Sequence, residues 1–178
     1  MYEEREFDGA NNLLLSAIHS QSSATIVQCI LKVLPSKNKI KKEGGFLAQA
    51  CHYGNIDVVK LLINEGAATT QALYVQAGAK TEKELRILEI LIEAVDDVNQ
   101  VEIEASALEY ALEFGCETGI WMLINAGADI NFSRNVNGRI FDAKTVIDER
   151  HEMIRKGKSQ RSPLSDDLLT LIQEARLS

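Results

Sequence analysis

The sequence predicts an all-α fold, a solenoid of stacked helix-turn-helix repeats joined by short or missing β-hairpins. Residues 45–68 contain two short apolar helix patterns, with one glycine at the turn between them and another after the second. The same arrangement recurs over residues 106–131, and the glycine pairs Gly54/Gly66 and Gly115/Gly127 are both 12 residues apart. Helices of about two turns are marginal in water by themselves. Each unit therefore has to bury its apolar face against neighbours of its own kind.

The composition fits one globular, helix-rich domain. The chain has 178 residues, 46% of them apolar, and only two prolines. Aromatic residues make up 6%, so we expect a core of Leu, Ile, Val and Ala. The formal net charge of −7 disfavours a general nucleic-acid binder, because such a protein needs a basic surface to neutralise phosphates.

The cysteines and the N-terminal residues predict a cytoplasmic protein. Cys29, Cys51 and Cys116 lie far apart without a C-x-x-C pair, which suits reduced thiols. Residues 1–8 are acidic and polar, unlike a secretory signal peptide. No apolar run approaches the roughly 20 residues that a membrane span needs. A bacterial protein exported into a host-cell cytoplasm would leave the same pattern.

The repeated unit resembles a known family. Its second helix contains the run Ile56-Asp-Val-Val-Lys-Leu-Leu62, and its exit is spelled Gly127-Ala-Asp-Ile-Asn131. Together with a Leu-x-x-Ala first helix and the glycine turn, these fragments resemble the ankyrin repeat. The resemblance implies an ankyrin-type solenoid that binds protein partners through its concave face. It also suggests an adaptor or a secreted bacterial effector as the biological role.

The resemblance divides residues 1–178, taken as a single domain, into four repeats and a modified end. The approximate repeats are 11–37, 43–68, 69–99 and 104–134, and the C-terminal cap is 135–178. Leu14 and Leu47 are 33 residues apart, the family period. The third repeat is irregular: its connector after Gly66 is about seven residues short, so no hairpin is expected there. Lys80–Glu84 reads as an insertion in its turn, before a helix over Leu85–Glu93.

The C-terminal cap and the helix starts depart from the family pattern. Residues 135–139 resemble the hairpin that opens a fifth repeat, and two helices are expected over Phe141–Ile154 and Ser165–Glu174. The Thr-Pro-Leu-His tetrapeptide of the family is nowhere intact, and Ser106-Ala-Leu-Glu109 stands in one of its places. We therefore expect an irregular stack of modest stability.

Mapping the family's concave face onto this chain gives the candidate partner-binding residues. The last residues of each first helix include Tyr53 and Phe114, two aromatics expected to be exposed as interface anchors. The alternative is that both stack against neighbouring repeats. Residues 37–42 form a basic connector expected to be a hairpin on the same face. The predicted partner-binding set is His52, Tyr53, Glu113, Phe114, Lys41, Lys42 and Phe132.

Charge and Trp121 leave two further questions open. The segment Glu82–Glu117 is acidic, which favours a partner with a basic surface, although ordinary solubility charge explains it equally well. Trp121 occupies a position that normally faces solvent. It is expected to lie under the C-terminal cap, or else to serve as an oligomer contact, and a monomer is the expected state.

A cysteine-dependent enzyme is the alternative function. Cys51 and His52 are adjacent on a helix, where side chains point about 100° apart and do not face each other. A nucleophile would therefore be Cys116 or Cys51 activated by a distant histidine. The histidines and cysteines show no zinc-ligand spacing, and no glycine-rich phosphate loop is present. The sequence thus predicts no metal, no cofactor and no catalytic residue, and favours a non-catalytic protein-binding module.

Overall fold

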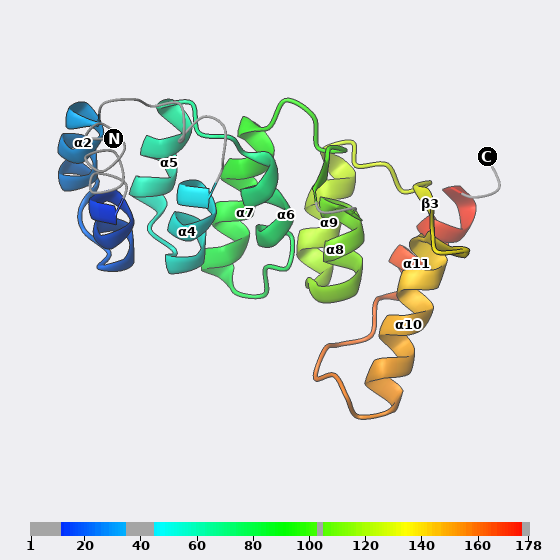
Figure 1. Cartoon of the computed structure of the whole chain (residues 1–178). Helices are drawn as coiled ribbons and strands as arrows, with labels where there is room; N and C mark the ends of the chain where they lie inside the picture. Colours follow the sequence, from blue (N-terminus) through cyan, green and yellow to red (C-terminus); the bar gives the residue numbers. More distant parts are fainter. Residues whose placement is uncertain (1–11, 35–44, 103–104, 176–178) are drawn as a thin grey trace.

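The computed structural model describes residues 12–34, 45–102 and 105–175 (Figure 1). Residues 12–19 are helical. The other helices of the repeats are α2 (Ala24–Val33), α4 (Gly45–Tyr53), α5 (Ile56–Asn64), α6 (Thr70–Gln76), α7 (Glu82–Ala94), α8 (Ala107–Phe114) and α9 (Glu117–Asn125). The remaining elements are β1 (Val101–Glu102), β2 (Ala105–Ser106), β3 (Ser133–Val136), β4 (Arg139–Asp142), α10 (Ala143–Arg155) and α11 (Asp166–Ala175). The basic connector at 37–42, with Lys41 and Lys42, lies outside the described residues.

The helices stack in two parallel rows (Figure 1). In the inner row, α6 packs between α4 and α8, and α10 continues the row against α8. In the outer row, α2 packs on α5, α5 on α7 and α7 on α9. Within one repeat, the two helices pack on each other, as α4 does on α5. This arrangement confirms the predicted ankyrin-type helical solenoid.

One aliphatic core runs through the stack and explains why such short helices are stable. Leu47, Leu62, Leu88 and Leu112 have relative exposures of 0% and belong to the same buried cluster. Each fully buried leucine contributes about 1.5–3 kcal/mol relative to leaving it exposed. Because the partners of each side chain come from the adjacent repeats, burial rather than intrinsic helix propensity stabilises the helices.

The repeated glycines have two different physical reasons. Gly54, Gly66 and Gly127 have φ values of 69°, 82° and 90°, in the left-handed region where glycine ends a helix without steric cost. Gly115 has a φ of −79°, which any residue adopts. A Cβ on Gly115 would lie 2.6 Å from the carbonyl oxygen of Ala77, so this position instead needs close backbone packing between repeats.

The third repeat begins its second helix earlier than predicted. Helix α7 starts at Glu82 rather than Leu85, because Thr81 caps it. The Thr81 hydroxyl accepts from the backbone N–H of Glu84, and the Glu84 carboxylate accepts from the backbone N–H of Thr81. Most of the expected insertion is therefore the first turn of the helix. The short connector between α5 and α6 forms no strand, as predicted.

The C-terminal cap starts with a β-hairpin. Strands β3 and β4 pair antiparallel around Asn137 and Gly138, whose φ values of 53° and 84° fit a tight hairpin turn. The expected helix start at Phe141 was wrong, because this residue lies in β4. Asp142 caps α10 instead, accepting from the backbone N–H of Thr145 at 2.8 Å.

Candidate partner-binding surface

A histidine cluster lies at the N-terminal end of the inner row. The ring of Tyr53, at the end of α4, lies 5.1 Å from that of His19 and 5.2 Å from that of His52. Tyr53 is half-buried, while His19 and His52 are exposed. We call these three residues the histidine cluster. It joins the first two repeats through polar aromatic edges that remain accessible to solvent.

A second group of aromatic rings, which we call the tyrosine cluster, crosses α6 and α8. The ring of Tyr110 lies 4.6 Å from that of Tyr74 and 4.7 Å from that of Phe114. The Tyr110 ring packs against Gly78, and a Cβ on Gly78 would lie 2.8 Å from the ring. Val75, beside Tyr74 on α6, is 46% exposed. The cluster therefore forms a continuous, half-buried apolar surface on the inner row.

The two predicted anchors are less exposed than expected. Tyr53 and Phe114 are both half-buried, because each packs in a ring stack with its neighbours. In the third repeat, Ala79 is 3% exposed and does not extend this surface. Helix α6 ends early, at Gln76, so Tyr74 takes the surface position that the assumed alignment missed.

The loop between α10 and α11 closes over one end of the tyrosine cluster. The Arg161 guanidinium lies 4.7 Å from the Phe114 ring centroid, and its Nη1 donates to the Glu113 carbonyl at 2.7 Å. Glu113 is an exposed residue of this rim. Burial raises the pKa of its carboxyl, and nearby Arg161 offsets part of that rise. The predicted residues Glu113 and Phe114 thus meet a basic side chain that the sequence analysis did not assign to this surface.

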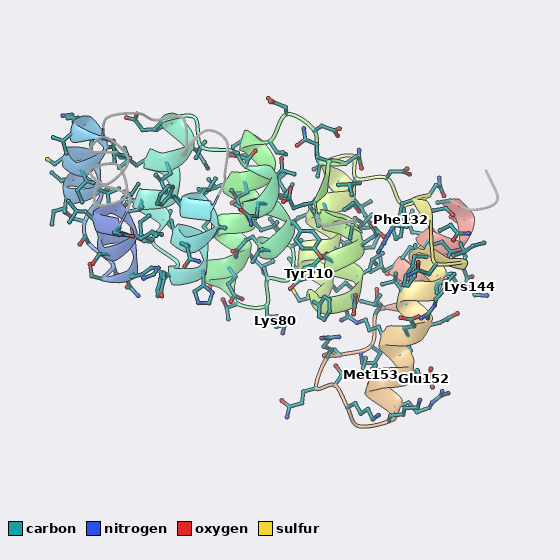
Figure 2. All side chains as sticks on the ribbon, viewed as in Figure 1. Lys80, Tyr110, Phe132, Lys144, Glu152 and Met153 are labelled. Atoms are coloured by element: carbon teal, nitrogen blue, oxygen red, sulfur yellow. The ribbon has the colours of Figure 1, made fainter. Side chains whose placement is uncertain are left out.

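Phe132 lies at a separate place. It is half-buried against the core immediately before β3, and Figure 2 shows it toward the C-terminal end, apart from Tyr110. Next to it, Arg134 donates to the buried carboxylate of Glu109 at 2.6 Å and lies 5.0 Å from the Phe141 ring. The structure therefore brings together His52 with Tyr53, and Glu113 with Phe114, but leaves Phe132 outside both clusters.

Comparison with known proteins identifies the repeats. A family model described as ankyrin repeats in three copies matches residues 47–134. Residues 47–134 are divergent ankyrin repeats. The chain is 28% identical over 138 residues to an ankyrin repeat and KH domain-containing protein from Caenorhabditis briggsae. That match covers 75% of this chain but only 5% of the relative.

The acidic residues of the segment Glu82–Glu117 do not form one inner-row patch. Glu82, Glu89 and Glu93 are exposed on α7, which belongs to the outer row, and Glu89 pairs with Arg86 at 2.9 Å. Glu109 is 6% exposed and paired with Arg134. The segment that reads as one acidic run is thus divided between two faces and the interior.

The cysteines of the ankyrin stack lie in different surroundings. Burial raises the pKa of the Cys51 thiol to about 12, so it stays protonated and is a poor nucleophile at neutral pH. Cys29 is exposed on α2 and Cys116 is half-buried before α9. His19 and His52 contact Tyr53, and His151 lines a groove between α10 and α11. None of these contacts pairs a thiol with a base.

Trp121 is connected to the C-terminal cap. Its Nε1 donates to the Glu117 carboxylate at 3.2 Å, and that carboxylate also accepts from the backbone N–H of Ser165 at 2.9 Å. Trp121 is half-buried against the core. None of the described helices is both long enough and apolar enough to cross a membrane.

Proposed function

We propose that this chain is a non-catalytic protein–protein interaction module whose partner binds across the inner row of the ankyrin stack. One observation carries the proposal: aromatic side chains from three successive inner helices, Tyr53, Tyr74, Tyr110 and Phe114, share this surface. Tyrosine and other large aromatics anchor interfaces because they bury much area with few rotatable bonds. We propose that residues 1–178 act as one domain in this role.

The half-burial of the rings supports this proposal. Tyr110 is held between Tyr74 and Phe114 and rests on Gly78, so its rotamer is fixed before any partner arrives. A side chain that is already ordered loses little entropy on binding, and this preorganisation favours affinity. Val75 and His52 stand exposed beside the stacked rings and complete the surface.

Photocrosslinking tests the location of the partner. A benzophenone side chain placed at position 75 should trap a specific protein from lysate, whereas the same group at position 33 on the outer helix α2 should not. Val33 is a fair control because it is also exposed, at 72%. A Tyr53→Ala, Phe114→Ala double variant should lose that product, since interface anchors typically contribute about 2 kcal/mol or more each.

A control variant on the outer helix α2 tests whether the loss of the crosslinked product is specific to the inner row. An Ile26→Ala, Val33→Ala double variant removes two exposed apolar side chains from α2 and should keep the product. Circular dichroism must show both double variants folded. If the product forms equally from position 33, or survives loss of Tyr53 and Phe114, the partner does not bind the inner row.

The finer expectations remain part of the proposal. We infer a monomer that works in a cytoplasm, as an adaptor or as an effector delivered into a host cell, in keeping with its unpaired thiols. A basic partner surface would meet the exposed carboxylates of α7 on the outer row rather than the aromatic rings. Light scattering at high concentration tests the monomer directly, and a dimer would instead favour the oligomer role weighed for Trp121.

A further inference from the structure

A pocket of about 720 Å³ lies where the cap returns to the ankyrin stack. The loop at residues 156–165 folds back beneath the inner-row end of the stack (Figure 1). Lys80, in the turn after α6, points from the lower edge of the stack on the side of that loop (Figure 2). The pocket is lined by Lys80, Cys116, Arg150, Lys158 and Arg161, with further residues of the loop.

The lining carries a surplus of positive charge. Lys80, Arg150, Lys158 and Arg161 are four cations, and none of them forms an ion pair with any part of the chain that the structure describes. The carboxylate in the lining is Glu117, which already accepts hydrogen bonds from Ser165 and from the Trp121 ring. Glu113 lies on the rim beside Arg161 and does not line the pocket.

Arg150 shows the consequence of this surplus most directly. It is 3% exposed, and its guanidinium donates to three carbonyls, those of Leu112, Gly115 and Ser162. Its Nε is buried without a hydrogen-bond partner. Burial lowers the pKa of Arg150, and the nearby charge of Arg161 lowers it further. The Glu117 carboxylate offsets part of this effect, but the lining still sets four cations against one carboxylate, so an anion in this pocket would be stabilised.

We propose that this pocket binds a phosphoryl group. A phosphomonoester carries a charge of about −1.5 to −2 at neutral pH and three strong acceptor oxygens. A phosphomonoester therefore matches two lysine ammonium groups and an arginine guanidinium better than a carboxylate ligand would. The volume also exceeds what one carboxylate would fill.

The position of Arg161 connects the pocket with the tyrosine cluster. Its guanidinium stacks on Phe114 and also lines the pocket, so the two sites share this side chain. A partner segment lying on Tyr74, Tyr110 and Phe114 would therefore bring a phosphorylated residue to the pocket mouth. This second step rests on the proposed function, whereas the binding of phosphate itself does not.

Cys116 gives a direct readout, because it lines the pocket and is half-buried. In a Cys29→Ser background, iodoacetamide alkylates Cys116 while buried Cys51 reports on folding by remaining unmodified. Inorganic phosphate should slow the alkylation about threefold at twice its dissociation constant, since two-thirds of the pockets are then occupied. Sodium chloride at equal ionic strength should leave the rate unchanged.

A pair of variants separates the pocket from general charge effects. Lys80→Gln with Lys158→Gln should abolish the protection, while Lys60→Gln with Lys144→Gln removes two exposed lysines elsewhere and should keep it. Equal rates in phosphate and chloride, or equal protection in both variants, would overturn the proposal.

Phosphatase treatment distinguishes the source of the phosphoryl group. If phosphate protects Cys116 and the product crosslinked at position 75 disappears from phosphatase-treated lysate, the group belongs to the partner. If Cys116 is protected but the product persists, the pocket binds a free phosphorylated small molecule, and the partner-borne step is wrong. Failure of the crosslink with intact protection would contradict only the protein-binding proposal.

Discussion

At the scale of single residues, a buried charged side chain, Glu109, has a central part in the fold. Glu109 is 6% exposed and combines two tasks: its carboxylate caps α8 through the backbone N–H of Ser106 at 2.7 Å, and it pairs with Arg134 of β3. This arrangement replaces the missing family tetrapeptide at the start of the fourth repeat. The Ser-x-x-Glu spacing at Ser106–Glu109, which departs from the family tetrapeptide, is itself a capping-box signal.

Glu109→Gln should therefore destabilise the folded protein. The amide keeps a hydrogen-bonding oxygen but loses the charge that faces Arg134, and breaking a largely buried pair leaves its partner uncompensated. We expect a loss of about 2 kcal/mol in the free energy of unfolding, measured by urea titration.

The matched control is Glu89→Gln. Glu89 pairs with Arg86 on the exposed surface of α7, with side-chain exposures of 47% and 62%. Exposed pairs of this kind contribute about 0.5 kcal/mol or less. Equal losses in the free energy of unfolding from the two substitutions would mean that the Glu109–Arg134 pair stabilises the fold no more than an exposed pair does.

At the scale of elements, the cap is anchored to the ankyrin stack by the start of α9. Glu117, in the first turn of α9, accepts from the backbone N–H and the hydroxyl of Ser165, which precedes α11. The hydrogen bond from the Ser165 hydroxyl lowers the pKa of Glu117 below its usual 4.5, and the bonds from the Ser165 N–H and Trp121 add to this. The helix over Ser165–Glu174 was predicted, but the attachment of Ser165 to Glu117, 48 residues away, has no local sequence signal.

The lowered pKa makes cap attachment depend on acid. The unfolded carboxyl titrates near 4.5 and the folded one below it, so the stabilisation is complete above pH 4.5 and is lost as pH falls through the folded value. Between pH 5 and pH 3, wild type should lose more of its melting temperature than Glu117→Gln does. A variant with the same acid sensitivity as wild type would show that Glu117 does not hold the cap.

Elements that depend on local sequence could be predicted, whereas features that depend on contacts between distant residues could not. Helix periodicity and the glycine turns are local, so the helix pairs within residues 45–68 and 106–131 were anticipated. The start of α7 was missed although Thr81 and Glu84 spell a capping box, which local inspection could have found. The tyrosine cluster and the pocket were not predictable, because they depend on α6 ending at Gln76 and on a loop returning across many residues.

For the whole molecule, the repeats are joined by a recurring turn as well as by the core. Asp97 accepts from the backbone N–H of Asn99 at 2.9 Å, and Asp129 accepts from that of Asn131 at 2.8 Å. The exits of the third and fourth repeats therefore adopt the same turn. Asn99 then reaches the next repeat, donating to the Gly127 carbonyl at 3.1 Å and accepting from the Asp129 N–H at 2.6 Å.

Loss of that bridge should act on one side of the stack more than on the other. In a repeat solenoid each unit is stabilised chiefly by its neighbours, so weakening the boundary between the third and fourth repeats uncouples the two parts. Asn99→Ala removes two inter-repeat hydrogen bonds and should lower the free energy of unfolding by about 1–2 kcal/mol. Native-state hydrogen exchange should accelerate in α8, α9 and α10 and change little in α4 and α5.

Asn64→Ala, an exposed change at the end of α5, is the control. Uniform acceleration along the chain would instead show that the whole stack opens as one cooperative unit.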